Sequence, residues 1–463
     1  MFFGHLPIFA NFSKAHPRDV NVHHFHTWLS ANCGSYFPGF DILPPVVYLD
    51  LWPISDSLAM ITDPGTASQF TVTTSLPKVG VFKQMMEPLT SCNDIICTEG
   101  QDWKTWRSRF NPGFSQRNLN ALLPEILEEV GVFVDGLKDL SGKDGQWGQV
   151  FQLHKKTINL TFDVICRAAL GIRLHEQTNK SDGILKRSLL DQLRLMGIMA
   201  NAARAIPIGR MPWHNAAVIR NNKTMRDYLL PHIQKKLEDG TESSKKKTVL
   251  DLAIDQSDGQ KPSAEFVDSL ISNLKAFLFA GHDTTASSIC FMMKLLQDNP
   301  DCLENLCAEH DAVLGSDLDK TAEVLKASPH LLQSLPYTVG VIKETLRLFP
   351  LAATVRESHA GLRLTGADSP LEYPMDRFGL WLSAPTIQRH PGYWTRPDEF
   401  LPERWLDNDG PLRPPKNAWL PFSLGPRNCI GMELAMMELK LVSVFTARTF
   451  SVEEAWADWD RER

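Results

Sequence analysis

The interpretation of this 463-residue chain is decided by one stretch, Phe422-Ser423-Leu424-Gly425-Pro426-Arg427-Asn428-Cys429-Ile430-Gly431. It places a single cysteine on a glycine-punctuated loop, directly before a predicted helix over Glu433–Phe445. Glycine allows the backbone to approach a flat ligand closely. The positive end of a helix and nearby backbone amides favour the thiolate form of a cysteine. The stretch therefore predicts that Cys429 is a thiolate that faces a pocket.

A lone thiolate facing a pocket is the ligand that a haem iron needs where O–O cleavage is required. The alternative for any cysteine is a buried structural role beside a turn, which we expect for Cys33 and Cys166. The eight cysteines are sparse and irregularly spaced. This usage is typical of free thiols in a reducing compartment and not of a secreted disulfide scaffold.

Phe422–Gly431 resembles the haem-binding signature of the cytochrome P-450 monooxygenases, and further motifs occur in the order of that family. These are Trp103–Arg107 (W-x-x-x-R), Ala280–Thr285 in a long central helix, and Glu344–Arg347 (E-x-x-R) with its partner segment Pro402–Trp405. Each short motif is weak alone, but together they identify the chain as a member. One departure is Trp106, which stands where many relatives carry His, so one propionate contact is expected to be lost or altered.

The resemblance implies a haem b site with Cys429 as axial thiolate and metal ligand. The cofactor-binding residues it implies are Trp103, Arg107, Ala280, Gly281, Arg356, Phe422, Gly425, Arg427, Cys429 and Gly431. The cationic and indole side chains among them would bind the propionates, since buried carboxylates need charged donors. Gly281 would open room for O₂.

Two other groups of residues receive roles from the resemblance. Asp283 and Thr284 would be the catalytic pair that delivers protons on the distal side. Glu344, Arg347 and Arg404 would form a buried structural ion network near the proximal face. Removing one partner of such a network typically costs about 3–5 kcal/mol.

Hydrophobic periodicity predicts a mainly α fold with small β-sheets, the fold of the cytochrome P-450 family. The predicted helices are Leu119–Leu137, Leu153–Leu170, Ile184–Ala205, Ala216–Leu237, Ser263–Leu296, Leu303–Leu314, Tyr337–Leu348 and Glu433–Phe445. Length alone suggests about three domains. Because the motifs must converge on one haem, we instead predict a single domain over 1–463. Its first part, 1–99, would be mainly strands and loops, and 100–463 would be the helical haem-binding part.

Composition excludes several classes of protein. Hydrophobic residues make up 43% and charged residues 22%, which is ordinary globular composition. The net charge of −6 argues against binding along a phosphate backbone. Gly142, Gly145 and Gly148 fall in a polar loop and predict no dinucleotide-binding turn. We expect His23, His24 and His26 at the surface, and His282 as an outward-facing spectator.

The sequence shows no membrane span and no signal peptide. Against the family pattern, the N-terminal anchor and the C-terminal hairpin are expected to be absent, which leaves a cytosolic location open. The resemblance implies the cytosolic face of the endoplasmic reticulum membrane. It also implies that NADPH acts only through a partner, NADPH–cytochrome P-450 reductase, with cytochrome b5 as a further candidate.

The favoured function is a monooxygenase that uses O₂ to hydroxylate or epoxidise a lipophilic small molecule. Arg389–Pro391 and Asn111–Ser115 resemble filamentous-fungal members, which implies a polyketide or terpenoid of secondary metabolism. Two alternatives stay open. One is a reductase-independent haem-thiolate isomerase or dehydratase, which the intact Asp283–Thr284 pair disfavours. The other is a truncated, non-catalytic remnant.

Overall fold

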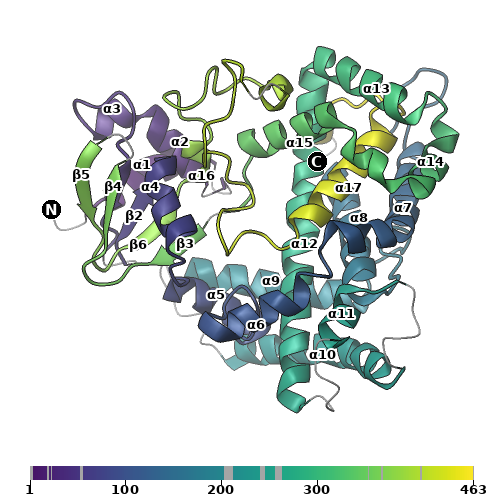
Figure 1. Cartoon of the computed structure of the whole chain (residues 1–463), viewed down its shortest axis with the longest axis horizontal. Coiled ribbons are helices and arrows are strands. Elements are labelled where there is room, and N and C mark those ends of the chain that lie inside the picture. Colours follow the sequence, from purple (N-terminus) through teal and green to yellow (C-terminus); the bar gives the residue numbers. More distant parts are fainter. Residues whose placement is uncertain are drawn as a thin grey trace. The chain divides into compact units, whose positions relative to one another are not determined.

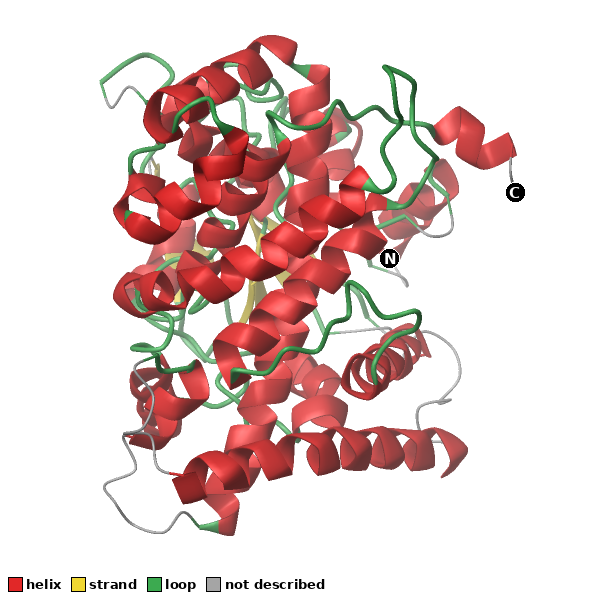
Figure 2. Cartoon of the chain, turned by 90° about the vertical axis from the view of Figure 1, so that its right-hand side faces the viewer, coloured by secondary structure: helices red, strands yellow, loops and turns green. Residues whose placement is uncertain are grey.

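The computed structural model describes residues 4–17, 20–21, 23–52, 56–202, 212–239, 246–255, 263–352, 354–366, 369–406 and 409–461. Helices make up most of this part of the chain, and the strands form two small sheets (Figures 1 and 2). The predicted fold class, mainly α with small β-sheets, is confirmed.

Two compact units form within the chain, and each is built from two separate segments. The first unit comprises Met1–Lys83 and Leu346–Cys429, and the second comprises Gln84–Thr345 and Ile430–Arg463. That the whole chain acts as one domain remains a prediction.

The first unit contains both sheets. The strands are β1 (Val46–Leu49), β2 (Leu58–Ile61), β3 (Thr354–Glu357), β4 (Arg363–Gly366), β5 (Ser369–Pro374) and β6 (Gly379–Leu382). The larger sheet has the order β1-β2-β6-β3, with β2 and β6 parallel and the other pairs antiparallel. β4 and β5 form a separate antiparallel pair. Every residue of β6 is buried, as expected for a central strand.

The segment 1–99, predicted to be mainly strands and loops, contains more helix than expected. Besides β1 and β2 it contains α1 (Leu6–Ala15), α2 (His24–Ala31), α3 (Cys33–Tyr36), α4 (Pro64–Ser68) and α5 (Gly80–Thr90). α1 and α2 are short, and they are stabilised by a core that includes Phe12, Phe25 and Leu29 with Met60 of β2. Such short helices depend on tertiary packing more than on their own propensity, so local composition did not reveal them.

The second unit is helical. Its helices, with α15 ending in the first unit, are α6 (Gly100–Phe110), α7 (Gln116–Lys138), α8 (Leu153–Leu170), α9 (Ile184–Ala202), α10 (Pro212–Asp239), α11 (Val249–Asp255), α12 (Ala264–Asp298), α13 (Pro300–Leu314), α14 (Thr321–Ala327), α15 (Pro336–Leu348), α17 (Met432–Thr446) and α18 (Trp456–Arg461). A short helix of the first unit, α16 (Ala384–Ile387), precedes the segment that leads to Cys429. The predicted helices are confirmed to within a few residues, except that the predicted 203–205 end of α9 lies outside the described residues.

The central helix α12 begins and ends for local reasons. The Ser263 hydroxyl accepts a hydrogen bond from the amide of Phe266 and thereby caps the first turn. The helix continues for 35 residues through its polar middle and ends at Asp298, and Pro300 then opens α13. α8 packs along α12, and it ends at Gly171, whose φ of 73° places it in the left-handed region.

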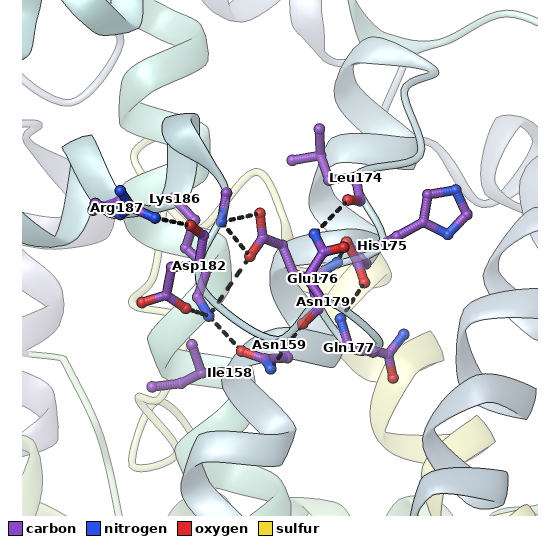
Figure 3. A network of polar contacts seen from close by, with 12 residues as sticks. Ile158, Asn159, Leu174, His175, Glu176, Gln177, Asn179, Asp182, Lys186 and Arg187 are labelled. Atoms are coloured by element: carbon purple, nitrogen blue, oxygen red, sulfur yellow. Dashed lines mark hydrogen bonds and ion pairs between the residues drawn. The ribbon is translucent and has the colours of Figure 1, made fainter.

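A buried polar network fixes the loop between α8 and α9, as Figure 3 shows. Lys186 of α9 donates to Asp182 at 2.6 Å and to Asn159 of α8. The Glu176 carboxylate accepts the amide of Gly183 at 3.1 and 3.0 Å. Since a buried lysine is costly unless it is paired, this network fixes the start of α9 against α8.

Candidate active site

The Cys429 loop is folded onto itself by backbone hydrogen bonds. The amide of Cys429 donates to the Phe422 carbonyl at 2.8 Å, and the amide of Asn428 donates to the Gly425 carbonyl at 3.1 Å. All eight cysteines lie in the described part of the chain, and among them only Cys429 is exposed. Cys33 and Cys166 are buried, as predicted. The fold therefore presents one thiol at the surface of a closed loop.

Gly425 is required by the geometry of this loop. Its φ is +72°, and a Cβ built on it would lie 2.1 Å from the carbonyl oxygen of Thr71. A side chain would therefore be strained by its backbone conformation and would also clash with fixed backbone. The glycine lets the loop lie directly against the turn of Gln69–Thr73.

Gln388 links the segment that leads to this loop with the end of α15. Its amide nitrogen donates to the carbonyls of Leu346 at 3.1 Å and Arg347 at 2.8 Å. Its amide oxygen accepts the backbone N–H of Leu420 at 2.6 Å. Sequence reasoning missed this residue, because a glutamine in a turn-rich stretch carries no signal of burial.

The two arginines of the predicted structural network bind backbone carbonyls. Arg347 is fully buried and donates to the carbonyls of Gln388 at 2.7 Å, Pro397 at 2.6 Å and Glu399 at 3.0 Å. Its guanidinium also lies 5.0 Å from the ring centroid of Trp394. Buried charged donors of this kind fix the path of an irregular segment.

Arg404 acts on the same segment, donating to the carbonyls of Thr395 and Arg396. Glu344 of α15 is also fully buried. The burial expected for all three members of the network is thus observed, and their joint ionic role remains a prediction.

Arg356 and Arg427 are the cations of the first unit predicted to face the propionates. Arg356 lies on β3, is buried, and donates from Nη1 to the Leu76 carbonyl at 3.2 Å. Arg427 is half-buried on the cysteine loop, and Phe422 is half-buried at its start. The fold of this unit thus carries Arg356, Phe422, Gly425, Arg427 and Cys429 together in one compact body.

α6 carries Trp103 and Arg107 one turn apart, both half-buried. Residues at this spacing share a helix face. Trp106 instead lies in the core, where its ring stacks at 5.5 Å from Phe110 and from Phe266. The tryptophan that departs from the family pattern therefore has a packing role.

The polar middle of α12 presents exposed side chains at Ala280, Asp283 and Thr284. The Thr284 hydroxyl donates to the Ala280 carbonyl at 2.9 Å within the helix. Gly281 faces α8, since a Cβ there would lie 3.1 Å from Ile165 Cγ1. Close approach of the two helices thus gives a packing reason for this glycine, and its predicted role in making room for O₂ is not tested.

His282 is not outward-facing as predicted. It is buried, its Nδ1 lies 2.8 Å from the Leu278 carbonyl, and its ring packs near Phe162 of α8. Burial lowers the pKa of this histidine, against the raising effect of that carbonyl and of Asp283. Residue 282 directly precedes the exposed Asp283. Because successive side chains on a helix are turned by about 100°, the two neighbours face different environments.

The surface location predicted for His26 is also wrong, because the side chain is fully buried and its Nδ1 lies 2.5 Å from the Ser383 hydroxyl. Burial and the nearby charge of His23 lower the pKa of His26 to about 3. No group of His, Cys, Asp and Glu within the described ranges is arranged to hold a metal ion.

A residue that sequence reasoning missed contacts Asp283. Nε2 of His154, in the first turn of α8, lies 3.3 Å from Asp283 Oδ1 and 3.2 Å from the Ser287 hydroxyl. The hydrogen bond from His154 lowers the pKa of Asp283, while burial opposes this and the charge of His282 assists it. No local pattern could have found this pair, because it joins two helices far apart in the sequence.

The residues present fit a haem-thiolate centre in their chemistry. The first unit supplies one exposed thiol on a glycine loop, with Arg356 and Arg427 in the same body. The second supplies Trp103 and Arg107 on one helix face and a carboxylate–hydroxyl pair at Asp283 and Thr284. Thiolate, cationic donors and an acid–alcohol pair are what an oxygen-activating haem requires of a protein.

Comparison with known proteins establishes the family. The family model "Cytochrome P450" matches residues 50–461, and the chain belongs to this family. Cytochrome P450 monooxygenase polC of Polytolypa hystricis is 35% identical over 100% of this chain and 82% of its own length. Cytochrome P450 monooxygenase acrF of Aspergillus aculeatus is 29% identical over 89% of this chain and 85% of its own. Cytochrome P450 monooxygenase ptmG of Penicillium ochrochloron is 26% identical over 98% of this chain and 82% of its own.

The protein is thus a cytochrome P450 monooxygenase, and membership implies haem-thiolate iron. Among the described helices none has the length and apolar character needed to cross a bilayer.

Proposed function

We propose that the protein hydroxylates or epoxidises a lipophilic small molecule, of polyketide or terpenoid type, in fungal secondary metabolism. One atom of O₂ enters the substrate, and the other leaves as water after taking up two protons and two electrons. The electrons come from NADPH through NADPH–cytochrome P450 reductase. Docking of the protein at the cytosolic face of the endoplasmic reticulum membrane would place it beside that partner.

The observation that carries the proposal is the single exposed thiol of Cys429 on its closed loop. A thiolate-ligated haem activates O₂ for insertion into unactivated bonds. Cys429 would hold this group, with Phe422, Gly425 and Gly431 along the loop. The backbone closure at Phe422 and Gly425 fixes the path of the loop that carries the Cys429 side chain.

Four side chains would orient the group through its carboxylates: Trp103 and Arg107 of α6, Arg356 of β3, and Arg427 of the cysteine loop. Arginine is suited to this role because its planar fork binds carboxylates in a fixed geometry. Ala280 and Gly281 would form the distal wall.

Proton delivery would fall to Asp283 and Thr284. Both side chains are exposed on α12, and an exposed aspartate is ionised at neutral pH, so the Asp283 carboxylate can accept a proton from solvent. The Thr284 hydroxyl, held on the Ala280 carbonyl, would hand the proton on. General acid catalysis of this kind contributes about 10²–10⁴-fold.

The substrate class is supported by the organisms of the three relatives named above, which are fungi. On α12, Ala276 and Phe277 are buried, and Phe277 packs edge-on against Phe110 and Phe114. These contacts place both side chains in the core of the helical unit.

Ligation is tested with the carbon-monoxide complex of the reduced protein. We expect the red-shifted Soret band of thiolate ligation in the wild type and its loss in Cys429→Ala. Cys302→Ala, which removes a half-buried thiol on α13, is the matched control and should keep the band. An unchanged band in Cys429→Ala would refute the ligand assignment.

The reaction class is tested with purified reductase, NADPH and candidate polyketides and terpenoids. An oxygenated product carrying ¹⁸O from ¹⁸O₂ is expected. Conversion that needs neither reductase nor NADPH would instead favour the isomerase or dehydratase.

A further inference from the structure

The proton-delivery residue Asp283 is joined to a second titratable side chain on a neighbouring helix. His154 Nε2 lies 3.3 Å from Asp283 Oδ1, and both side chains are about half exposed, at 48% and 57%. α8 packs along α12, so the backbones that carry the two residues are fixed relative to each other.

This contact decides where the carboxylate points. Thr284 follows Asp283 directly, and successive side chains on a helix are turned by about 100°. The Thr284 hydroxyl bonds the Ala280 carbonyl, whereas Asp283 reaches across to α8. The imidazole therefore holds the carboxylate in one of the directions open to an exposed aspartate.

Ser287, one turn after Asp283, holds the imidazole in turn, because its hydroxyl lies 3.2 Å from the same Nε2. Nε2 can donate to Asp283 when it carries a proton, and it can accept from Ser287 when it does not. A three-member cluster results, with its histidine open to solvent on α8.

Two histidines lower the pKa of Asp283. His154 acts through a hydrogen bond and lowers the pKa of Asp283, and His282 of the same helix adds a smaller favourable charge effect. His282 is buried and bonded to carbonyls of its own helix, so it cannot orient the carboxylate. Of the two histidines, only His154 both lowers the pKa of Asp283 and contacts its carboxylate from another helix.

We propose that His154 is the positioning residue of Asp283: it holds the carboxylate in the orientation from which proton delivery starts. The inference rests on the proton-delivery role of Asp283 given under the proposed function, and it assigns to that role a residue on a different helix.

The first test measures the carboxylate itself, without turnover. Protein labelled with ¹³C at aspartate carboxyls is titrated by NMR, and the Asp283 resonance is assigned by its loss in Asp283→Asn. We expect His154→Ala to raise the pKa of Asp283 and to broaden its resonance. His154→Gln, which can still donate one hydrogen bond, should keep the resonance sharp. Lys155→Ala changes an exposed neighbour on the same turn and should have no effect.

The second test measures proton use during O₂ reduction with reductase and NADPH. For His154→Ala we expect the ratio of water to hydrogen peroxide formed to fall about fivefold, as for loss of one exposed charge-assisted hydrogen bond. The solvent deuterium isotope effect on NADPH consumption should increase. His154→Gln should restore most of both values, and Lys155→Ala should match the wild type. The carbon-monoxide band verifies that each variant is folded and loaded.

The outcomes separate this inference from the proposed function. If Asp283→Asn leaves the water-to-peroxide ratio unchanged, the proton-delivery role of Asp283 is refuted and the inference with it. If Asp283→Asn lowers the ratio but His154→Ala behaves like Lys155→Ala, the inference alone is refuted. If His154→Gln is as impaired as His154→Ala in both tests, positioning by a hydrogen bond is refuted.

Discussion

Replacing Arg347 by alanine should remove a large share of the stability of the protein. The guanidinium is fully buried and makes hydrogen bonds of 2.6–3.0 Å to three backbone carbonyls, those of Gln388, Pro397 and Glu399. It also lies over the ring of Trp394. In Arg347→Ala these carbonyls lose their charged donor, and the volume of the side chain is left empty.

The magnitude follows from these contacts. A buried polar group left without its partner costs about 1–3 kcal/mol. Water that enters the cavity left by the side chain can bind the carbonyls in part, so the cost for each carbonyl should lie in the lower half of this range. Counting about 1–1.5 kcal/mol for each of the three carbonyls gives about 3–4.5 kcal/mol, within the range typical of breaking a buried charged network. Since domains are stable by about 5–15 kcal/mol, this loss is a large share of the total stability.

The assay is urea unfolding followed by tryptophan fluorescence, with the yield of soluble protein as a second readout. Arg347→Lys keeps one charged donor and should lie between the wild type and Arg347→Ala. The control is Arg396→Ala, since Arg396 is in the segment that Arg347 binds, but its own partner Glu399 is exposed with it. That variant should unfold at nearly the same urea concentration as the wild type, because an exposed ion pair contributes little to stability. If the free energies of unfolding of Arg347→Ala and Arg396→Ala differ by less than about 1 kcal/mol, carbonyl binding by Arg347 does not stabilise the segment as argued.

Three further predictions concern pH and backbone geometry. The pKa of His26 is lowered to about 3 in the folded state, whereas the ordinary pKa of histidine is about 6.5. Between these two pH values the unfolded state binds a proton at His26 and the folded state does not. Stability should therefore fall as pH drops from about 6.5 towards 3, by about 2 kcal/mol at pH 5, and urea titrations of His26→Gln should lack this part of the loss. Burial raises the pKa of Glu438 well above its usual value, so the folded state loses stability as pH rises above about 4.3, where the carboxyl of the unfolded chain ionises. The free energy of unfolding of Glu438→Gln, relative to that of the wild type, should therefore increase between pH 4 and pH 8. A difference between the two free energies that stays constant over that range would contradict the argument. Gly425→Ala should lose most haem-loaded protein, judged by the carbon-monoxide band, because a Cβ would meet the Thr71 carbonyl at 2.1 Å; Gly361→Ala, with φ of +77° and open space around it, isolates the cost of the backbone conformation alone and should keep most of the band.

What the sequence revealed was local. The cysteine loop is specified within Phe422–Gly431, and the helix α12 is specified by its own periodicity and its serine cap. Both could be predicted because the residues that determine them are neighbours along the chain.

What the sequence concealed depends on pairs distant along the chain. His26 is buried because Ser383 of another segment receives it, and Asp283 is held by His154 of another helix. Gln388 links the end of α15 to Leu420 through one amide group. None of these side chains differs in its local context from a solvent-exposed polar residue, so only the folded chain identifies its partner.

The contact of Gly281 with Ile165 has a consequence for how this protein can evolve. The two helices lie so close that a methyl group at position 281 would stand 3.1 Å from the isoleucine side chain. A change of Gly281 to alanine therefore becomes tolerable once position 165 has first become smaller, for example valine or alanine, and is disfavoured before that. The order of the two substitutions is thus constrained, and lineages that carry a larger residue at 281 should carry a smaller one at 165.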